Sequence, residues 1–229
     1  MIKIIKDYIP AGKENRPHTN PRSSLYKKVM KPEYLTYHNP HSPGWDAKRL
    51  HEYGYRQWVR PAVKSWGYSV DKDVAYQMLP NDEGGWHAGD NLGDGNTNSI
   101  GMEVCDRGAY TKDWNLFWAD QDGAARLCAH LIKTIPSLKP FPECMKQHHD
   151  WSGKNCPYWI RIQSGGWQRL LGMIEEYLKV ADDTKPIDPN LYYRVIIGSY
   201  RQRANADRAL AEAKAKGFTD AFIVAFRRD

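Results

Sequence analysis

The sequence predicts an α/β protein with a second, much smaller unit at its C-terminal end. Three observations lead to this fold class. Strand-like runs alternate with helix-like runs through the middle of the chain, which is typical of α/β domains. A polar segment with two prolines, residues 181–190, interrupts that pattern and indicates a linker. A further strand, helix and strand are expected beyond it.

The first predicted elements lie between residues 34 and 80. Residues 34–38, YLTYH, alternate aromatic and β-branched side chains after a proline-rich lead-in, so they predict a strand. Apolar residues at helical spacing predict a helix over about residues 46–65, which Pro61 would kink. The runs GYSVD and VAYQMLP, joined at DKD, predict a hairpin of two short strands.

A glycine-rich loop without regular structure is expected at residues 81–98, and its length indicates a binding loop. The strand that follows is 99-SIGMEVCD-106. Its apolar residues occupy alternate positions, so Glu103 should point to the opposite face of the strand. Residues 120–135 and 165–179 predict amphipathic helices.

These elements divide the chain into a domain over residues 1–180, a linker over 181–190 and a small unit over 191–229. In the small unit, YYRVIIGSY predicts a strand, an alanine-rich stretch ending at Gly217 predicts a helix, and AFIVAF predicts a second strand. Lys and Arg outnumber Asp and Glu by eight to four in residues 191–229, so much of the basic charge lies there.

Composition limits the kind of protein this can be. The 229 residues are 41% hydrophobic with a mean hydropathy of −0.72, which predicts a soluble globular protein. No apolar run approaches the roughly 20 residues that span a bilayer, and no signal peptide is visible. The net charge of +6 favours an anionic partner, which leaves nucleic acid, an acidic wall polymer and a membrane surface open. The four cysteines form no CxxC pair, so free thiols or one metal-ligating thiol are expected.

One segment, 147-QHHDWSGKNCP-157, contains the residue types of a metal site. Zinc takes imidazole and thiolate ligands, and a catalytic zinc site keeps one position open. A histidine and Cys156 can reach one ion through the glycine-containing turn between them, with His38 at the end of its predicted strand as the third ligand. Spacing alone, however, favours a polar loop with a packed thiol.

Four segments change this interpretation, because together they resemble a known family. They are 35-LTYHN-39, 86-WHAGD-90, 98-NSIGMEVC-105 and 147-QHHDWSGKNCP-157. In type and order they are similar to the motifs of the zinc-dependent N-acetylmuramoyl-L-alanine amidases of the amidase-2 group, which includes phage endolysins, bacterial autolysins and peptidoglycan recognition proteins. The resemblance covers residues 30–180 and implies a mixed central sheet flanked by helices.

The resemblance also implies the zinc ligands. His38, His148 and Cys156 match the family's three ligands. His148 is preferred to His149 because it alone stands eight residues before the cysteine, which is the family's spacing. The implied cofactor is Zn²⁺, which lowers the pKa of bound water to about 7 and so provides a nucleophile for amide hydrolysis.

Further matches imply the groups that act beside the metal. Glu103 matches a carboxylate that moves protons, and Lys154 matches a lysine that stabilises the oxyanion. His87 and Trp86 match loop residues beside the cleft, so contact with substrate is expected. Without the motifs, these four would be a solvated strand residue, a surface lysine, a turn cap and a loop anchor. Gly67 departs from the pattern, because many relatives have a histidine there whose contribution must be absent or supplied elsewhere.

The C-terminal unit resembles one repeat of the SPOR domains, which bind peptidoglycan. Its strand ends in Gly-Ser-aromatic, its helix starts with Asn-Ala, and Gly-Phe precedes the closing strand. A full SPOR domain has two such repeats, and a lone βαβ unit is too small to bury a stable core. We therefore expect a homodimer through residues 191–229 in which two chains share one sheet. The alternative is a basic tail that only aids solubility.

The sequence thus predicts an endolysin, a zinc amidase that cuts the amide bond between N-acetylmuramic acid and L-alanine. Its expected partner is bacterial peptidoglycan, with neither nucleic acid nor a membrane. Without a visible signal peptide, it should stay in the host cytoplasm until a holin releases it to the cell wall. The alternatives are a non-catalytic peptidoglycan-binding protein, a secreted autolysin with the same chemistry, and a nucleic-acid-binding protein, although no basic helix or aromatic RNA-binding motif is recognisable.

Overall fold

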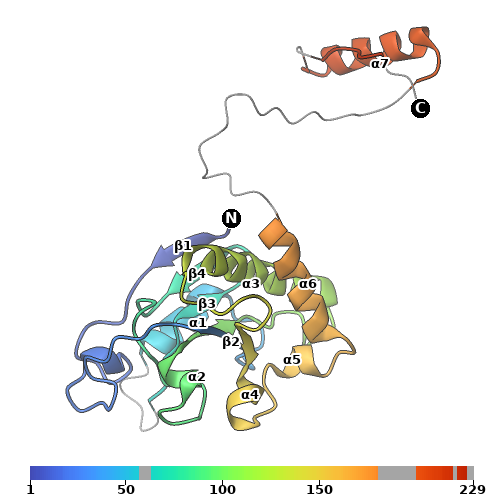
Figure 1. Ribbon diagram of the computed structural model, residues 1–229. Coiled ribbons are helices and arrows are strands. Elements are labelled where there is room, and N and C mark those ends of the chain that lie inside the picture. Colours follow the sequence, from blue (N-terminus) through green and yellow to red (C-terminus); the bar gives the residue numbers. More distant parts are fainter. Residues whose placement is uncertain (57–62, 180–199, 219–220, 226–229) are drawn as a thin grey trace. The chain divides into compact units, whose positions relative to one another are not determined.

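The computed structural model describes residues 1–56, 63–179, 200–218 and 221–225, and the chain forms two units, Met1–Ala181 and Asp182–Asp229. The first unit contains a six-stranded sheet in the order β1-β4-β3-β5-β2-β6 (Figure 1). Its strands are β1 Lys3–Lys6, β2 Tyr34–His38, β3 Tyr68–Val70, β4 Val74–Gln77, β5 Ser99–Val104 and β6 Met145–Gln147. Strands β3 and β4 are antiparallel, whereas the other neighbouring strands run parallel. The sheet is therefore mixed.

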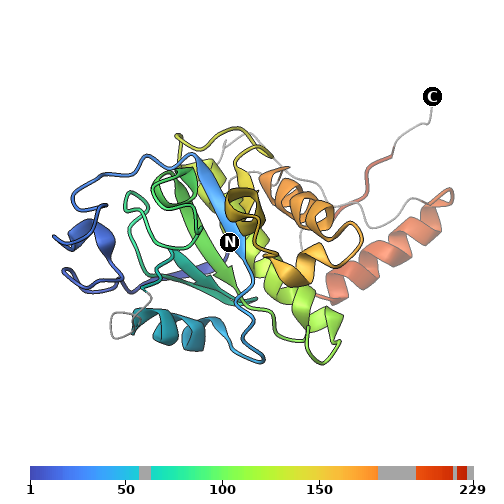
Figure 2. The same cartoon turned by 90° about the horizontal axis from the view of Figure 1, so that it is seen from below.

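Helices pack on both faces of this sheet (Figures 1 and 2). The helices of the first unit are η1 Pro17–Thr19, α1 Ala47–Tyr55, α2 Asp94–Thr97, α3 Trp114–Thr134, α4 His148–Ser152, α5 Tyr158–Arg161 and α6 Gly166–Lys179. Helices α3 and α6 pack together over the face that carries Tyr37, Tyr68 and Met102. Helix α1 packs over a second cluster, which includes Trp66 and Met78. Side chains alternate along β5, so Glu103 lies on the opposite face from Met102.

The strand at residues 34–38, the hairpin at β3–β4 and the helix near 165–179 are confirmed. Helix α3 begins earlier than the predicted start at residue 120. The Asp113 side chain caps it, accepting a hydrogen bond from the Leu116 N–H at 3.1 Å. This cap adds a first turn, from Trp114, in which polar and aromatic residues obscure the apolar period.

The helix predicted over residues 46–65 is wrong at residue 56 and at residues 63–65, and its expected kink at Pro61 lies outside the described residues. Helix α1 ends at Tyr55, and residues 57–62 lie outside the described part of the chain. Beyond them, Ser65 is not helical, because its backbone N–H bonds to the Trp86 carbonyl at 3.1 Å. A contact with a distant loop thus replaces the local helical bond.

Three short elements differ from the sequence prediction. The loop at 81–98 contains one helical turn, α2, so the expectation of no regular structure is wrong there. Strands β1 and β6 were not predicted. Both are edge strands that pair in parallel with strands far away in the sequence, β4 and β2 respectively.

The second unit contains one described helix, α7 Arg203–Ala215, which confirms the predicted alanine-rich helix. The strand predicted within residues 191–199 lies outside the described residues. The strand predicted at 221–226 is wrong for residues 221–225, which have no regular structure. None of the helices in the described ranges has the length and apolar character needed to cross a membrane.

Candidate metal centre

Three donor side chains meet at the carboxyl ends of two adjacent parallel strands. His38 is the last residue of β2, and His148 directly follows β6. The register pairs Tyr37 with Gln147, so the next residue on each strand lies beside the other. The two Nδ1 atoms are 3.0 Å apart, and the Cys156 Sγ is 3.8 Å from the His38 Nδ1.

The turn after α4 brings the cysteine back to the histidines. The backbone N–H of His149 bonds to the Cys156 carbonyl at 3.0 Å, and the Gly153 N–H bonds to the His149 carbonyl at 2.9 Å. Gly153 has a φ of 74°, a left-handed conformation that glycine adopts without strain. These bonds explain how a thiol eight residues after His148 reaches the same point.

Helix α4 itself is anchored at both ends. Gln147 and Asp150 form a reciprocal capping box at its start. The Trp151 Nε1–H donates to the Thr36 hydroxyl at 2.8 Å, and the Trp151 ring packs edge-on against Tyr34 at 5.3 Å. His149 points elsewhere, because it is 41% exposed and its ring nitrogen lies 3.9 Å from the Asp150 carboxylate. The helix therefore presents only His148 to the cluster.

The donor set fits a zinc ion. The ligand atoms of His38, His148 and Cys156 lie within 4.8 Å of one another, and all three residues are buried. Tetrahedral zinc with ordinary bond lengths separates such donors by about 3.3 to 3.6 Å, close to the separations observed. Two imidazoles and one thiol are also the ligand types zinc prefers, and three ligands leave a fourth position for a reactant.

Burial sets the protonation of these donors. Desolvation lowers the pKa of His38 well below its usual value and lowers that of His148 to about 4, so both rings are neutral. Desolvation raises the pKa of the Cys156 thiol to about 12. A metal that binds here must therefore displace the thiol proton, which couples binding to pH.

Glu103 lies beside this cluster, since the register of β2 and β5 pairs it with His38. One of its carboxylate oxygens, Oε2, is buried without a hydrogen-bond partner among the described residues. Desolvation raises the pKa of Glu103 to about 7, against the opposing effect of Lys154 and Lys64. An unpaired carboxylate of this kind is suited to exchanging protons with a bound reactant.

Two exposed lysines act on the site through their charge. The charge of Lys154 lowers the pKa of Glu103, His38 and His148. Lys64 also lowers the pKa of Glu103 and of His148. Sequence reasoning missed Lys64 because it lies outside the four motifs.

The loop residues His87 and Trp86 occupy different positions. The His87 ring packs edge-on to His38, with its Nδ1 3.2 Å from the His38 Nε2. Trp86 is half-buried, and its backbone exchanges bonds of 2.9 and 3.1 Å with Ser65. The structure thus places the His87 ring against a predicted zinc ligand, whereas Trp86 is fixed through its backbone.

Close packing explains why residue 67 is a glycine. A Cβ at this position would meet the Ile100 Cγ2 at 2.9 Å and the Gly101 carbonyl oxygen at 3.2 Å. Its backbone also bonds to the Gly101 carbonyl at 2.9 Å. A histidine at residue 67 would therefore require Ile100 or Gly101 in β5 to give way.

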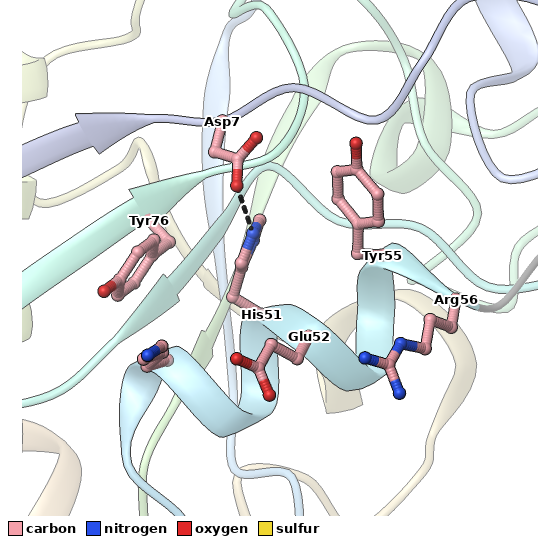
Figure 3. Close-up of a pocket in the computed structure, with 7 residues that line it drawn as sticks. Asp7, His51, Glu52, Tyr55, Arg56 and Tyr76 are labelled. Atoms are coloured by element: carbon pink, nitrogen blue, oxygen red, sulfur yellow. Dashed lines mark hydrogen bonds and ion pairs between the residues drawn. The ribbon is translucent and has the colours of Figure 1, made fainter.

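A separate cavity of about 510 Å³ lies between α1 and the β1–β4 edge (Figure 3). At its centre His51 stacks on Tyr76 at 4.9 Å and bonds to the Asp7 carboxylate at 2.9 Å, which ties α1 to that edge. Strands β3 and β5 separate β4 from β2 in the sheet. The cavity is therefore distinct from the metal centre.

Comparison with known proteins gives consistent results. The N-acetylmuramoyl-L-alanine amidase family matches residues 28–159, and the SPOR domain family matches residues 177–228. The chain is 33% identical over 195 residues to the N-acetylmuramoyl-L-alanine amidase CwlH of Bacillus subtilis, covering 82% of this chain and 68% of CwlH. It is 35% identical to the amidase XlyA of the same organism, covering 69% of this chain and 47% of XlyA.

Two solved catalytic-domain structures are also similar to this chain. The catalytic domain of XlyA superposes with a TM-score of 0.61 at 31% identity, covering 76% of this chain and 99% of that domain. The solution structure of the PlyG catalytic domain gives a TM-score of 0.63 at 25% identity, covering 81% of this chain and 99% of that domain. Because the amidase match takes in more than half of the chain and includes every donor of the metal centre, the chain belongs to the N-acetylmuramoyl-L-alanine amidase family.

Proposed function

We propose that this protein is a zinc-dependent N-acetylmuramoyl-L-alanine amidase that hydrolyses the amide bond between N-acetylmuramic acid and L-alanine in peptidoglycan. One observation carries the proposal: a buried cluster of two histidines and a cysteine lies beside Glu103, whose Oε2 is buried without a hydrogen-bond partner among the described residues. Three metal ligands and an adjacent proton acceptor are the minimum that metal-assisted amide hydrolysis needs.

His38, His148 and Cys156 would hold the ion, which supplies Lewis acidity and activates water at neutral pH. Glu103 takes the proton of the attacking water and passes it to the leaving amine of the alanine. Its pKa of about 7 suits both transfers, because a base and an acid work best near the ambient pH. Lys154 places positive charge where the oxyanion of the tetrahedral intermediate develops.

The C-terminal unit would hold the enzyme on its polymeric substrate. The match to the SPOR family and the basic charge of residues 191–229 support binding to peptidoglycan, an anionic polymer. The division at 1–180, 181–190 and 191–229, and a dimer through the last segment, belong to this proposal. The route of an endolysin also belongs to this proposal: a holin releases the protein from the host cytoplasm.

Metal analysis coupled to wall hydrolysis tests the proposal. The full chain should contain about one zinc per molecule, clear purified walls and release new N-terminal alanine. A chelator should abolish both the metal and the activity, and added zinc should restore them. Wall binding without release of alanine would instead identify the non-catalytic peptidoglycan-binding protein.

A further inference from the structure

Both ligand histidines turn their second ring nitrogen toward the loop that contains residues 87–89. The His38 Nε2 lies 3.2 Å from the Nδ1 of His87. The His148 Nε2 lies beside Gly89, where a Cβ would be 3.6 Å from it. The loop therefore lies on the outer side of both rings, while each Nδ1 faces the donor cluster.

The bonds of His87 fix which nitrogen carries each proton. Its Nε2 lies 3.4 Å from the Ser99 carbonyl oxygen, which can only accept a hydrogen bond, so this nitrogen is the one protonated in a neutral ring. The Nδ1 of His87 is then an acceptor, and the Nε2 of His38 must donate to it. That leaves the Nδ1 of His38 with a bare lone pair directed at the cluster.

The same bonds leave His87 no free nitrogen. One ring nitrogen faces His38 and the other faces Ser99. A substrate group that bonded to His87 would have to displace one of these partners. The position of His87 therefore favours orienting the metal ligand His38. It does not favour the contact with substrate that the sequence led us to expect.

One buried side chain bonds to the backbone of both residue 87 and residue 88. The Asn96 Oδ1 accepts the backbone N–H groups of His87 and Ala88, each at 2.9 Å, and Asn96 is 2% exposed. Its amide group in turn donates to the Asn91 carbonyl at 2.9 Å. The two backbone groups beside the ligand histidines thus share a single acceptor.

Strand β5 provides the space for the His87 ring. A Cβ at Gly101 would lie 2.7 Å from two carbons of that ring and 2.8 Å from its Nδ1. Real Cβ atoms essentially never show such contacts, so any side chain at residue 101 must displace the His87 imidazole from its observed position. Glycine at this position is therefore required by the ring that packs on it.

We propose that His87 and Asn96 are positioning residues of the metal centre: they fix the tautomer of His38 and the orientation of His38 and His148, so that both present Nδ1 to the ion. The identity of the ion as zinc rests on the proposed function, whereas the hydrogen-bond relay rests on the observed contacts alone. Such outer hydrogen bonds typically change metal affinity by about 10- to 100-fold.

The first test uses the wild-type full chain loaded with zinc. Long-range ¹H–¹⁵N spectra of the histidine rings report which nitrogen is protonated and which is metal-bound. We expect His38 and His148 to bind through Nδ1, and His87 to be protonated at Nε2 only. Protonation of His87 at Nδ1, or zinc on the Nε2 of His38, would overturn the proposal.

The second test measures zinc affinity by competition with a chromophoric chelator. His87→Ala should weaken binding by about 10- to 100-fold, and His87→Gln should recover much of it, because the amide oxygen can accept the His38 proton. Asn96→Ala should also weaken binding, whereas Asn96→Asp keeps an acceptor for both N–H groups and should bind more tightly than Asn96→Ala. Gly101→Ala should act in the same direction as His87→Ala.

His149→Ala is the matched control, because His149 is adjacent to a ligand but points away from the cluster. It should bind zinc as the wild type does. Wild-type affinity in His87→Ala would refute the role of His87. The two proposals fail separately: tight zinc binding that depends on His87, in a protein that releases no alanine from walls, would contradict the amidase function and leave the relay intact.

Discussion

Cys156 is the residue on which the metal centre most depends, through its thiol. Replacing it by serine removes the soft donor, and a hydroxyl is a poor substitute for a thiolate on zinc. We expect Cys156→Ser to lose zinc and wall hydrolysis together, as measured by atomic absorption and turbidity. Retention of one zinc and full activity would contradict the ligand assignment.

Glu103 and Lys154 should affect turnover without affecting the metal. Neither contributes a donor atom to the cluster, so Glu103→Gln and Lys154→Ala should retain one zinc per chain. Turnover should fall about 100-fold or more, in kcat rather than in KM, because both groups act in the transition state. Release of the metal from either variant would show a structural role instead.

The pH dependence of kcat/KM should show the ionisation of the Glu103 carboxylate. A base works only when ionised, so kcat/KM should rise with pH through the pKa of Glu103. Burial raises that pKa to about 7 despite the opposing charges of Lys154 and Lys64, and a zinc ion would lower it, so the acid limb should lie at or below pH 7. Glu103→Gln should lose this limb, and an unchanged limb in that variant would assign it to another group.

The family resemblance named His38, His148 and Cys156, and the structure brings these three side chains together. Residue spacing alone favoured a polar loop with a packed thiol. The sequence did not predict the contacts made by His87. Those depend on Asn96, on the Ser99 carbonyl and on the room above Gly101, which are brought together only by the pairing of β2 with β5 and the packing of the loop on them. The spacing of residues along the chain does not predict such contacts.

At the scale of elements, α3 crosses the sheet very close to the turn between β3 and β4. A Cβ at Gly123 in α3 would fall far inside van der Waals contact with the Asp71 carbonyl. Gly123→Ala should therefore lower the free energy of unfolding by about 1 to 3 kcal/mol through overpacking, as measured by urea denaturation.

Gly172 in α6 is the matched control for this prediction. A Cβ there meets no atom of the described residues within 4 Å. Alanine favours a helix interior over glycine by about 1 kcal/mol, so Gly172→Ala should raise the free energy of unfolding. An increase in the free energy of unfolding in both variants would mean that helix propensity, and not the crossing, decides the effect.

The elements most easily predicted are those stabilised locally. Helix α6 has its own apolar stripe, and the β3–β4 hairpin has its own turn, so both are visible in the sequence. Strands β1 and β6 are only four and three residues long and exist because distant strands pair with them. Such pairing is a property of the whole sheet, which explains why periodicity gave no sign of either strand.

At the scale of the whole molecule, the two units should be separable in function. All three donors and Glu103 precede the predicted linker. A chain ending at Val180 should therefore hydrolyse soluble muropeptides at the full rate but bind whole walls more weakly, as measured by cosedimentation. Equal wall binding by the short and full chains would show that the residues after Val180 do not contribute to substrate capture.

The predicted dimer is tested on the same two proteins. In the tail, Phe218 is 61% exposed and Val224 is 49% exposed, so apolar surface is available for a second copy. Sedimentation equilibrium at tens of micromolar should give a dimer for the full chain and a monomer for the chain ending at Val180. A monomeric full chain would refute the shared sheet.

The distance along the chain between the metal donors has a consequence for the lifetime of the enzyme. His38 is separated from His148 by 110 residues and from Cys156 by 118 residues. A bound ion therefore acts as a crosslink that closes most of the first unit into a loop, and it stabilises the folded state by about 2.7 kcal/mol at a free metal concentration 100 times the dissociation constant. The melting temperature should rise with free zinc and fall when a chelator is added. Surroundings that remove zinc would then expose the chain to proteases as well as stop its chemistry, so the availability of the metal would determine how long the protein persists.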